Sequence, residues 1–513
     1  MTVRELLSHL QTDRGAKFQA LSGADAQVTS LCFDSRKLET GCVFFAIKGS
    51  KSDGHQFLKA AADAGALALI VEDAALVPKS YEGAFVVVSS TRKALNELAA
   101  FFYGEPAKKL FCVGVTGTNG KTTTTYMTEA IFNRAQKYAG VIGTINHHYR
   151  SHVWPTELTT PDPIAFQVRL AEFVSLGASA VALEVSSHAL TQSRVDEVPF
   201  DVAIFTNLTR DHLDYHRDMN DYFDAKHKLF RDLLSSSMKP QLTAVLNDDD
   251  SYSAKIVTAA RVQRWTFGTK ESATLRYVIL KQGFDGTTFS LSTPFGTQDF
   301  RLQMVGLHMV ANACGAIGAA LAAGIDLKTC AEALAELKGV SGRLEAVPNS
   351  KGVHVFVDYA HTDDALATVL HYLNEIRRQS LAEGQATSEP TNQTANRLIT
   401  VFGCGGDRDR GKRPLMAKVA VKDSDFVVLT SDNPRTEDPE QILDDAIAGV
   451  PDTKLGVTLF REVDRRKGIA KALDLAQKGD VVLIAGKGHE DYQILGTQKI
   501  HFSDVEIVTE ILK

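Results

Sequence analysis

Uninterrupted apolar runs that each end in a polar cluster are the feature that most constrains the fold of this chain. In the middle of the sequence these runs are residues 110–115, 180–183, 202–205 and 243–246. Strands that are covered by helices on both faces of a parallel sheet produce such runs. The polar residues that follow them then lie at the carboxyl edge of the sheet, where ligands bind. The pattern therefore predicts a parallel α/β sheet with a binding site along one edge.

The same pattern restarts after residue 342, and a shorter version precedes residue 92. The later runs are residues 353–357, 398–402, 426–429 and 481–485, and the early ones are residues 43–47, 66–71 and 85–88. A chain of 513 residues is too long for one hydrophobic core. We therefore predict an α/β protein of three domains. These are a small N-terminal α/β domain (1–95), a central P-loop ATPase domain with a parallel sheet (96–342), and a C-terminal Rossmann-like doubly wound domain (343–513).

The composition excludes several classes of protein. Lys and Arg total 56 against 62 Asp and Glu, so the formal net charge is −6, which speaks against a general nucleic-acid binder. The six cysteines form no C-x-x-C pair, and scattered thiols in a long chain are typical of a reduced, cytosolic protein. No stretch has the length of a membrane span, and the first ten residues lack a signal-peptide core. We expect a cytoplasmic monomer without nucleic-acid or membrane partners.

A glycine-rich turn follows the run at residues 110–115 and leads into a predicted helix. Its sequence is Gly117-Thr118-Asn119-Gly120-Lys121-Thr122. The backbone N–H groups of such a turn at a helix N-terminus suit phosphate oxygens. In a phosphate loop the lysine reaches the β- and γ-phosphates, and the threonine hydroxyl ligates magnesium. The general pattern has a glycine where this chain has Val115, so we predict a variant phosphate loop that binds ATP with Mg²⁺.

Several sequence motifs together give the chain a resemblance to the Mur ligases and folylpolyglutamate synthetases. They are residues 116–123, 184–188, 206–216, 341–345 and 358–362. Enzymes of this group use ATP to activate a carboxylate as an acyl phosphate and couple it to an amine. The resemblance covers essentially the whole chain, so we expect an ATP-dependent ligase that joins an amino acid to a carboxylate.

The loop and the resemblance together give candidate nucleotide and metal residues. The residues expected to bind ATP are Gly117, Thr118, Asn119, Gly120, Lys121, Thr122, Thr123, Asn312, Arg343 and Asp358. The expected catalytic residues are Lys121, Glu184, His212 and Lys226. Glu184 is a carboxylate at a strand end and suits a hard cation, and His212 resembles the family's second metal contact. With Thr122 and Lys226 they form the expected magnesium ligands.

Lys226 is expected to be modified. An ammonium group cannot bind magnesium, but in the family the matching lysine carries a carbamate formed with CO₂, which is an anionic oxygen ligand. Carbamate formation requires a neutral amine, and therefore a pKa lowered by nearby positive groups. The resemblance therefore implies that Lys226 is carbamylated.

The N-terminal segment resembles that of the family members that add the third residue to the peptide of UDP-N-acetylmuramoyl-L-alanyl-D-glutamate. The resemblance rests on residues 34–36, 41–46 and 53–57. It implies that this nucleotide-sugar peptide is a substrate. The residues expected to contact it are Ser35, Arg36, His55, Thr159, Thr160, Ser187 and Arg194.

The second substrate is expected to be meso-2,6-diaminopimelate. It differs from lysine by a distal carboxylate, for which the pocket needs a cation. Residues 432–435 match the diaminopimelate-type motif, and Arg435 offers a bidentate fork for that carboxylate. The residues expected to contact the amino acid are Arg408, Asp432, Asn433, Arg435, Gly486 and Glu490.

Three alternatives compete with this reading of the sequence. They are a lysine-adding homologue, a ligase like folylpolyglutamate synthetase, and a non-catalytic ATP-binding protein. The folylpolyglutamate enzyme would not need the N-terminal nucleotide-sugar segment, and the joint presence of Lys121, Glu184, His212 and Lys226 speaks against a non-catalytic protein. Residues 379–396 are polar and are expected to form a flexible surface insertion.

Overall fold

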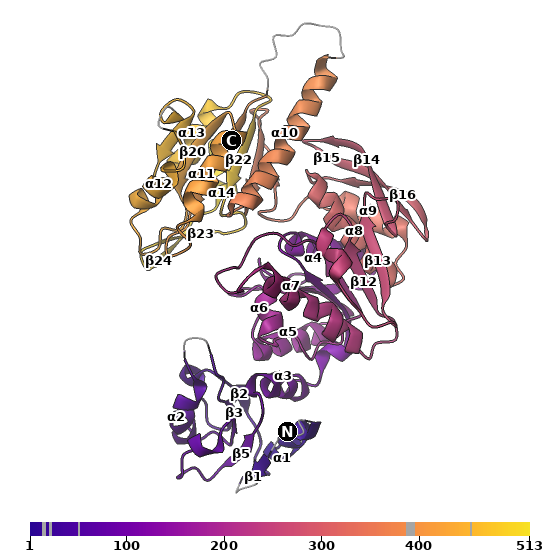
Figure 1. Ribbon diagram of the computed structural model, residues 1–513, viewed down its shortest axis with the longest axis vertical. Coiled ribbons are helices and arrows are strands. Elements are labelled where there is room, and N and C mark those ends of the chain that lie inside the picture. Colours follow the sequence, from indigo (N-terminus) through magenta and orange to yellow (C-terminus); the bar gives the residue numbers. More distant parts are fainter. Residues whose placement is uncertain (13–16, 20–22, 50–51, 386–395, 452–453) are drawn as a thin grey trace. The chain divides into compact units, whose positions relative to one another are not determined.

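The computed structural model describes residues 1–12, 17–19, 23–49, 52–385, 396–451 and 454–513 (Figure 1). The chain divides into two compact units. Unit 1 comprises Met1–Thr266 and Gly315–Asp326, and unit 2 comprises Phe267–Cys314 and Leu327–Lys513. Across the described residues, no helix is both long and apolar enough to cross a membrane.

The N-terminal part of unit 1 is a small α/β fold with a helix layer on each face of a sheet. The sheet order is β1-β5-β4-β3-β2, with β1 (Lys17–Gln19), β2 (Ser30–Cys32), β3 (Cys42–Phe45), β4 (Ala68–Val71) and β5 (Ala84–Val87). Strands β2 to β5 are parallel, and β1 pairs antiparallel to β5. Because side chains alternate along β3, Val43 and Phe45 pack with helices α1 (Val3–Ser8) and α3 (Thr91–Phe102), whereas Phe44 packs with α2 (Leu58–Asp63).

The rest of unit 1 is built on a parallel sheet with the phosphate-loop strand at its centre. Neighbouring strands follow the order β12-β11-β6-β10-β7, with β6 (Phe111–Thr116), β7 (Ala139–Ile142), β10 (Ala180–Glu184), β11 (Val202–Phe205) and β12 (Thr243–Asn247). These five strands pair in parallel, and the hairpin of β8 (His147–Tyr149) and β9 (His152–Trp154) continues antiparallel beside β7. The chain leaves β6 toward β7 on one side and later reaches β11 on the other. The carboxyl end of β6 is therefore a topological switch point, where ligands bind in open α/β sheets.

The helices of this region connect the strands across its two faces. They are α4 (Lys121–Arg134), α5 (Pro163–Ser175), the short α6 (Ser187–Thr191) and α7 (Met219–Lys228). Helix α7 continues into a π-helical turn, Leu229–Leu234. Strand β13 (Gln263–Gly268) then leads into unit 2.

Unit 2 begins with an antiparallel meander and two helices. The strands are β14 (Leu275–Gly283), β15 (Gly286–Thr293) and β16 (Gly296–Leu302), followed by α8 (Leu307–Ala322), whose residues from Gly315 onward belong to unit 1, and by α9 (Leu327–Glu336). Helix α9 packs against β16.

The C-terminal part of unit 2 is a second α/β sheet with the order β17-β18-β22-β19-β20-β21. Its strands are β17 (Glu345–Val347), β18 (His354–Asp358), β19 (Leu398–Cys404), β20 (Phe426–Ser431), β21 (Leu459–Glu462) and β22 (Val481–Ala485). All pair in parallel except β17. Helices α13 (Arg465–Leu475) and α14 (Asp504–Ile511) cover one face, and α10 (Asp363–Gln385), α11 (Lys412–Asp423) and α12 (Pro439–Ile447) pack side by side (Figure 1). The hairpin of β23 (Tyr492–Leu495) and β24 (Gln498–His501) follows β22.

A buried ion pair joins α13 to α14 beneath the carboxyl edge of this sheet. Arg465 donates to both carboxylate oxygens of Asp504 at 2.8 and 2.7 Å, and both side chains are 0% exposed. Arg465 also donates to the carbonyls of Ser431 and Ala485, which end β20 and β22. The arginine therefore fixes the strand ends from which two candidate site loops emerge.

Replacing Asp504 by Asn is expected to destabilise the C-terminal part by about 3–5 kcal/mol, because Arg465 would keep a buried charge without its counterion. The matched control is Arg466→Met on the same helix, since its partner Glu510 and Arg466 itself are more than half exposed. An exposed pair contributes at most about 1 kcal/mol. In urea unfolding, Asp504→Asn should therefore have a clearly lower midpoint than Arg466→Met. Equal midpoints would contradict the stabilising role of the buried Arg465–Asp504 pair.

The α/β class with small N-terminal, central P-loop and C-terminal Rossmann-like parts is confirmed. The boundaries near residues 95 and 342 stay predictions. The expected insertion at residues 379–396 is partly wrong, because α10 continues to Gln385. Residues 386–395 lie outside the described part of the chain.

Candidate active site

The phosphate loop lies between β6 and α4 and depends on two glycines. Gly117 has φ +152°, and a Cβ there would lie 1.9 Å from Thr206 Oγ1, so any side chain would displace the loop from the end of β11. Gly120 precedes α4 with φ +87°, a conformation that glycine adopts without strain. Lys121 curls back over the loop and donates to the carbonyls of Gly117 and Thr118 at 2.9 and 2.8 Å.

The residues that follow β11 hold the loop from behind. Thr206 Oγ1 donates to the Asn119 carbonyl at 2.6 Å. Asn207 accepts the Asn119 N–H on its side-chain oxygen and the Thr118 N–H on its carbonyl, both at 2.9 Å. The motif of residues 206–216 therefore begins as the support of the phosphate loop.

Glu184 ends β10, in register with Val115 of β6, and is 1% exposed. Its carboxylate accepts the backbone N–H of Thr144 at 2.8 Å and the Thr144 hydroxyl at 3.0 Å, one bond on each oxygen. A Cβ at Gly143 would lie 2.2 Å from Glu184 Oε1, so this glycine leaves room for the carboxylate. Because a carboxylate has about four acceptor positions, both oxygens of Glu184 retain capacity for a cation.

Lys226 projects from α7 to the same loop and is 1% exposed. Its Nζ lies 2.8 Å from the Gly117 carbonyl oxygen, which also accepts from Lys121 at 2.9 Å. Burial first, and the charge of Lys121 second, hold the pKa of Lys226 well below its usual range. The structure therefore brings a lysine with the lowered pKa that carbamylation requires to the phosphate loop.

His212 lies beside these lysines, in the loop after β11. Its backbone has φ +54°, and its ring packs edge-on against His188 and Tyr222 with centroids 5.1 and 5.8 Å away. Burial, reinforced by the charges of Lys121 and Lys226, lowers the pKa of His212 to about 4. The imidazole is therefore neutral near pH 7 and has a nitrogen lone pair for a metal ion.

Two of the expected magnesium ligands, Glu184 and Thr122, fit a hard cation by their oxygen donors, whereas His212 would offer a nitrogen. Glu184 supplies a carboxylate, Thr122 a hydroxyl at the start of α4, and His212 a neutral ring nitrogen. Within the described ranges no three His, Cys, Asp or Glu side chains form a group suited to a metal. The expected set contains only two such side chains, so further oxygens would have to come from modified Lys226 and from phosphates.

Two of the residues expected to hold the nucleotide sugar, Arg36 and His55, make hydrogen bonds within the N-terminal fold. Arg36 donates to both oxygens of its neighbour Asp34 at 2.9 and 2.7 Å and is 87% exposed, with Ser35 beside it in the same short helix. The His55 side chain is 6% exposed, with Nδ1 2.7 Å from Asp53 Oδ1, and its Nε2 accepts the Glu72 N–H at 3.0 Å. Both ring nitrogens of His55 are thus used internally, and its nucleotide contact stays a prediction.

The residues expected to hold the peptide differ in exposure. Thr160 and Ser187 are each 1% exposed; Thr160 donates to the Glu184 carbonyl at 2.7 Å, and Ser187 Oγ lies 2.9 Å from His216 Nε2. Thr159 and Arg194 are partly exposed. Arg194 donates to the Thr160 carbonyl at 2.6 Å and twice to Gln192, which leaves two of its N–H groups for an anion.

The remaining ATP candidates lie in unit 2, whereas the phosphate loop lies in unit 1. Asp358 ends β18 and accepts the N–H groups of Leu344 and Ala360 at 2.6 and 2.8 Å. Burial raises the pKa of Asp358, and the nearby Arg343 opposes that rise. The Arg343 guanidinium is 4.9 Å from the centre of the Tyr359 ring, and Asn312 is a buried residue of α8.

Three loops at the carboxyl edge of the C-terminal sheet, after β19, β20 and β22, carry the amino-acid candidates. Asn433, after β20, donates to Glu490 Oε2 at 2.9 Å, and Glu490 follows β22. Asp432 lies against Gly486, where a Cβ would be 2.8 Å from Asp432 Oδ2. Arg435 has φ +53° and donates from Nη1 to the Gly406 carbonyl at 2.7 Å. Arg408 is exposed, in the loop after β19.

Lys487, which the sequence motifs did not predict as a site residue, also belongs to this cluster. It is 0% exposed, and its Nζ lies 3.0 Å from Glu490 Oε2 and 3.9 Å from Asp432 Oδ1. The available signal was its position between two glycines directly after a buried strand. A lysine that cannot reach solvent from such a position must find carboxylates nearby.

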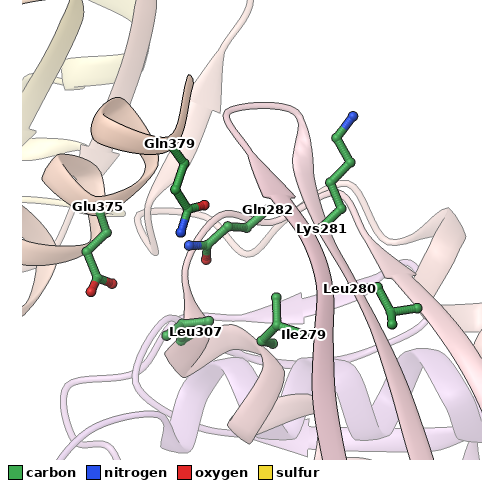
Figure 2. A pocket seen from close by; sticks show the side chains of 7 residues that line it. All are labelled: Ile279, Leu280, Lys281, Gln282, Leu307, Glu375 and Gln379. Carbon is green, nitrogen blue, oxygen red and sulfur yellow. The ribbon is translucent and has the colours of Figure 1, made fainter. Parts of the chain in front are cut away.

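A cavity of about 430 Å³ in unit 2 contains none of the predicted site residues. It lies between β14, the start of α8 and α10, and Figure 2 shows its lining side chains. They are Ile279, Leu280, Lys281, Gln282, Leu307, Glu375 and Gln379. The candidate active site is therefore defined by strand-end loops and not by this cavity.

A phosphate loop at the switch point of a parallel sheet, with a buried lysine and a carboxylate beside it, defines a nucleotide-using α/β enzyme. Three family models match the chain: the Mur ligase middle domain over residues 115–320, the Mur ligase glutamate ligase domain over residues 342–488, and the Mur ligase family catalytic domain over residues 27–103. The chain belongs to the Mur ligase family.

Relatives and a solved structure extend the similarity over the full length. The UDP-N-acetylmuramoyl-L-alanyl-D-glutamate–2,6-diaminopimelate ligase of Geobacter sulfurreducens is 44% identical over 494 residues, which are 94% of this chain and 93% of the relative. The ligase of the same name from Thermosynechococcus vestitus is 41% identical over 516 residues, covering 100% and 98%. A solved structure with that name is 32% identical, has a TM-score of 0.68, and covers 100% of this chain and 98% of its own.

Proposed function

We propose that this chain is the ATP-dependent ligase that adds meso-2,6-diaminopimelate to the D-glutamate of UDP-N-acetylmuramoyl-L-alanyl-D-glutamate. The observation that carries the proposal is the full-length similarity to ligases of that name, at 44% identity over 94% of the chain. The reaction passes through an acyl phosphate and builds the peptide of peptidoglycan precursors. We place it in the cytoplasm, where ATP and nucleotide sugars are made.

The phosphate loop performs the first half of the reaction in this proposal. The N–H groups at the start of α4, together with Lys121, hold the ATP phosphates while the D-glutamyl carboxylate attacks the γ-phosphate and ADP leaves. Thr122, Glu184, His212 and a carbamate on Lys226 would hold a magnesium ion, which would supply positive charge for the oxygens that meet there. Arg194 supplies its two remaining N–H groups to the anionic peptide.

The C-terminal loops perform the second half of the proposed reaction. They present the amino group of diaminopimelate to the acyl phosphate and bind its distal end. The distal carboxylate pairs with Arg435, and the distal ammonium pairs with the carboxylates of Asp432 and Glu490. Arg343 and Asp358, which lie 4.9 Å from the centre of the Tyr359 ring and at the end of β18 respectively, contribute contacts to the nucleotide in this proposal.

The alternatives have weaker support. A ligase of the folylpolyglutamate type would not need the N-terminal segment, which the Mur ligase catalytic-domain model matches over residues 27–103. A lysine-adding enzyme would not need a cation for a distal carboxylate, which Arg435 provides next to Asn433.

Replacing Arg435 by Ala is expected to lower kcat/KM for diaminopimelate about a hundredfold, because the distal carboxylate would lose its charged partner. The KM values for ATP and for the nucleotide-sugar peptide should stay unchanged. Arg466→Ala on the exposed side of the same domain is the control. Phosphate release at varied diaminopimelate concentration measures the effect, and a variant that keeps wild-type kcat/KM would overturn the assignment of Arg435.

A further inference from the structure

Lys487 is held in place by the backbone on both sides of it. Gly486 has φ +112° and Gly488 has φ +52°. A Cβ at Gly488 would lie 2.7 Å from Tyr359 Cβ and 2.9 Å from the Gly342 carbonyl oxygen, so the loop passes closely under its neighbours. These two turns direct the lysine side chain inward, where it is completely buried.

The ammonium group of Lys487 contacts three of the residues proposed to bind diaminopimelate. It donates to Glu490 Oε2 at 3.0 Å and to Asn433 Oδ1 at 3.3 Å, and it lies 3.9 Å from Asp432 Oδ1. Asn433 Oδ1 also accepts the N–H of Ile494 at 3.0 Å, which orients the amide so that its Nδ2 donates to Glu490. Lys487 is therefore the centre of one hydrogen-bonded cluster.

The charges of this cluster are unequal. Asp432 and Glu490 bring two negative charges, and Lys487 brings one positive charge. Arg465 is close enough to interact with both carboxylates, but it is neutralised by its bidentate pair with Asp504. The cluster therefore carries one surplus negative charge, which is enough for one ammonium group of a ligand.

We propose that Lys487 is a positioning residue that sets the preference of this pocket for a zwitterionic side-chain end over a purely cationic one. The inference rests on the proposed function. Diaminopimelate ends in an ammonium and a carboxylate on one carbon atom, whereas lysine ends in an ammonium alone. With Lys487 present, the cluster attracts the ammonium without strongly repelling the carboxylate, which Arg435 binds.

Without the charge of Lys487, the cluster would carry two surplus negative charges. It would then repel the distal carboxylate of diaminopimelate and attract lysine more strongly. Lys487→Gln removes the charge but keeps a hydrogen-bond donor for Glu490. Its effect therefore separates charge from hydrogen bonding.

The test compares kcat/KM for diaminopimelate and for lysine in the full-length enzyme with ATP and the nucleotide-sugar peptide. In Lys487→Gln the ratio of kcat/KM for diaminopimelate to kcat/KM for lysine is expected to fall at least roughly tenfold, mainly because the KM for diaminopimelate rises. The KM values for ATP and the nucleotide-sugar peptide should not change. Lys422→Gln removes the same charge from an exposed position at the end of α11 and should leave the ratio unchanged.

Lys487→Met, which keeps the volume of the side chain, provides the same measurement if the glutamine variant does not fold. An equal fall of kcat/KM for both amino acids, or an unchanged ratio, would show a merely structural role and overturn the proposal. A wild-type enzyme that prefers lysine or uses neither amino acid would overturn the proposed function itself, and this inference with it.

Discussion

Replacing Lys226 by alanine is expected to lower kcat about a thousandfold while the enzyme remains folded. The buried Nζ shares the Gly117 carbonyl with Lys121, and the pKa of Lys226 is far below its usual range. A neutral amine can react with CO₂ and release a proton, and we propose that the resulting carbamate places anionic oxygens at the phosphate loop. Loss of one preorganised group that stabilises transition-state charge costs about 10²–10³ in kcat.

Chemical rescue makes this prediction specific. Formate or acetate should restore part of the activity of Lys226→Ala, because a small carboxylate can occupy the space of the carbamate. In the wild-type enzyme, removal of CO₂ should lower kcat and bicarbonate should restore it. Labelled bicarbonate should give a carbamate signal in ¹³C NMR that is absent from the variant.

Lys228→Ala is the matched control on the same helix. The Lys228 ammonium forms an ion pair with Asp196, with an N–O distance of 2.8 Å, and within the described part of the chain it makes no hydrogen bond to the phosphate loop. Its loss should therefore affect stability and leave kcat nearly unchanged. An active Lys226→Ala variant, or a wild-type enzyme that is insensitive to bicarbonate and gives no carbamate signal, would contradict the assignment.

Replacing Lys121 by methionine is expected to lower kcat by a similar factor of about 10²–10³, because the ammonium that neutralises the transferred phosphate is lost. The loop itself should remain formed, since its backbone is held by Thr206 and Asn207. Steady-state kinetics and ATP titration together separate the loss of turnover from the loss of binding.

Two controls distinguish Lys121 from other lysines. Lys109 is an exposed lysine just before β6, so the Lys109→Met variant should have the kcat of the wild-type enzyme. Lys121→Met should also raise the fraction of charged Lys226, because the repelling neighbour is gone. A Lys121→Met enzyme with near-normal kcat would exclude the proposed role of the loop.

The buried strands of the fold were predictable from the sequence because burial on both faces leaves one signal, a continuous apolar run. Strands β11 and β22 have the predicted bounds, Val202–Phe205 and Val481–Ala485. The antiparallel meander β14–β16 was missed, because its strands alternate buried and exposed residues and carry charged side chains. Phe289 and Leu291 of β15, two residues apart and both buried, were the period-two signal that could have identified it.

The parts of the candidate site that lie within one short sequence motif were predictable from the sequence. The parts that depend on contacts between distant residues were harder to predict. The glycines and Lys121 define the phosphate loop within a few residues. Lys226 meets that loop from more than a hundred positions away, and only the family resemblance pointed to it. The contacts of Lys487 with Asn433 and Asp432, and the bond from the Glu72 N–H to His55, could not be inferred, because they depend on which loops meet in space.

Phosphate release from ATP by the wild-type enzyme decides whether this chain is the proposed ligase. It should be measured with UDP-N-acetylmuramoyl-L-alanyl-D-glutamate and either diaminopimelate or lysine, and with each component omitted in turn. We expect sustained release only with the nucleotide-sugar peptide and diaminopimelate together, matched by formation of the tripeptide product. Release that is independent of the nucleotide-sugar peptide, or faster with lysine than with diaminopimelate, would contradict the account.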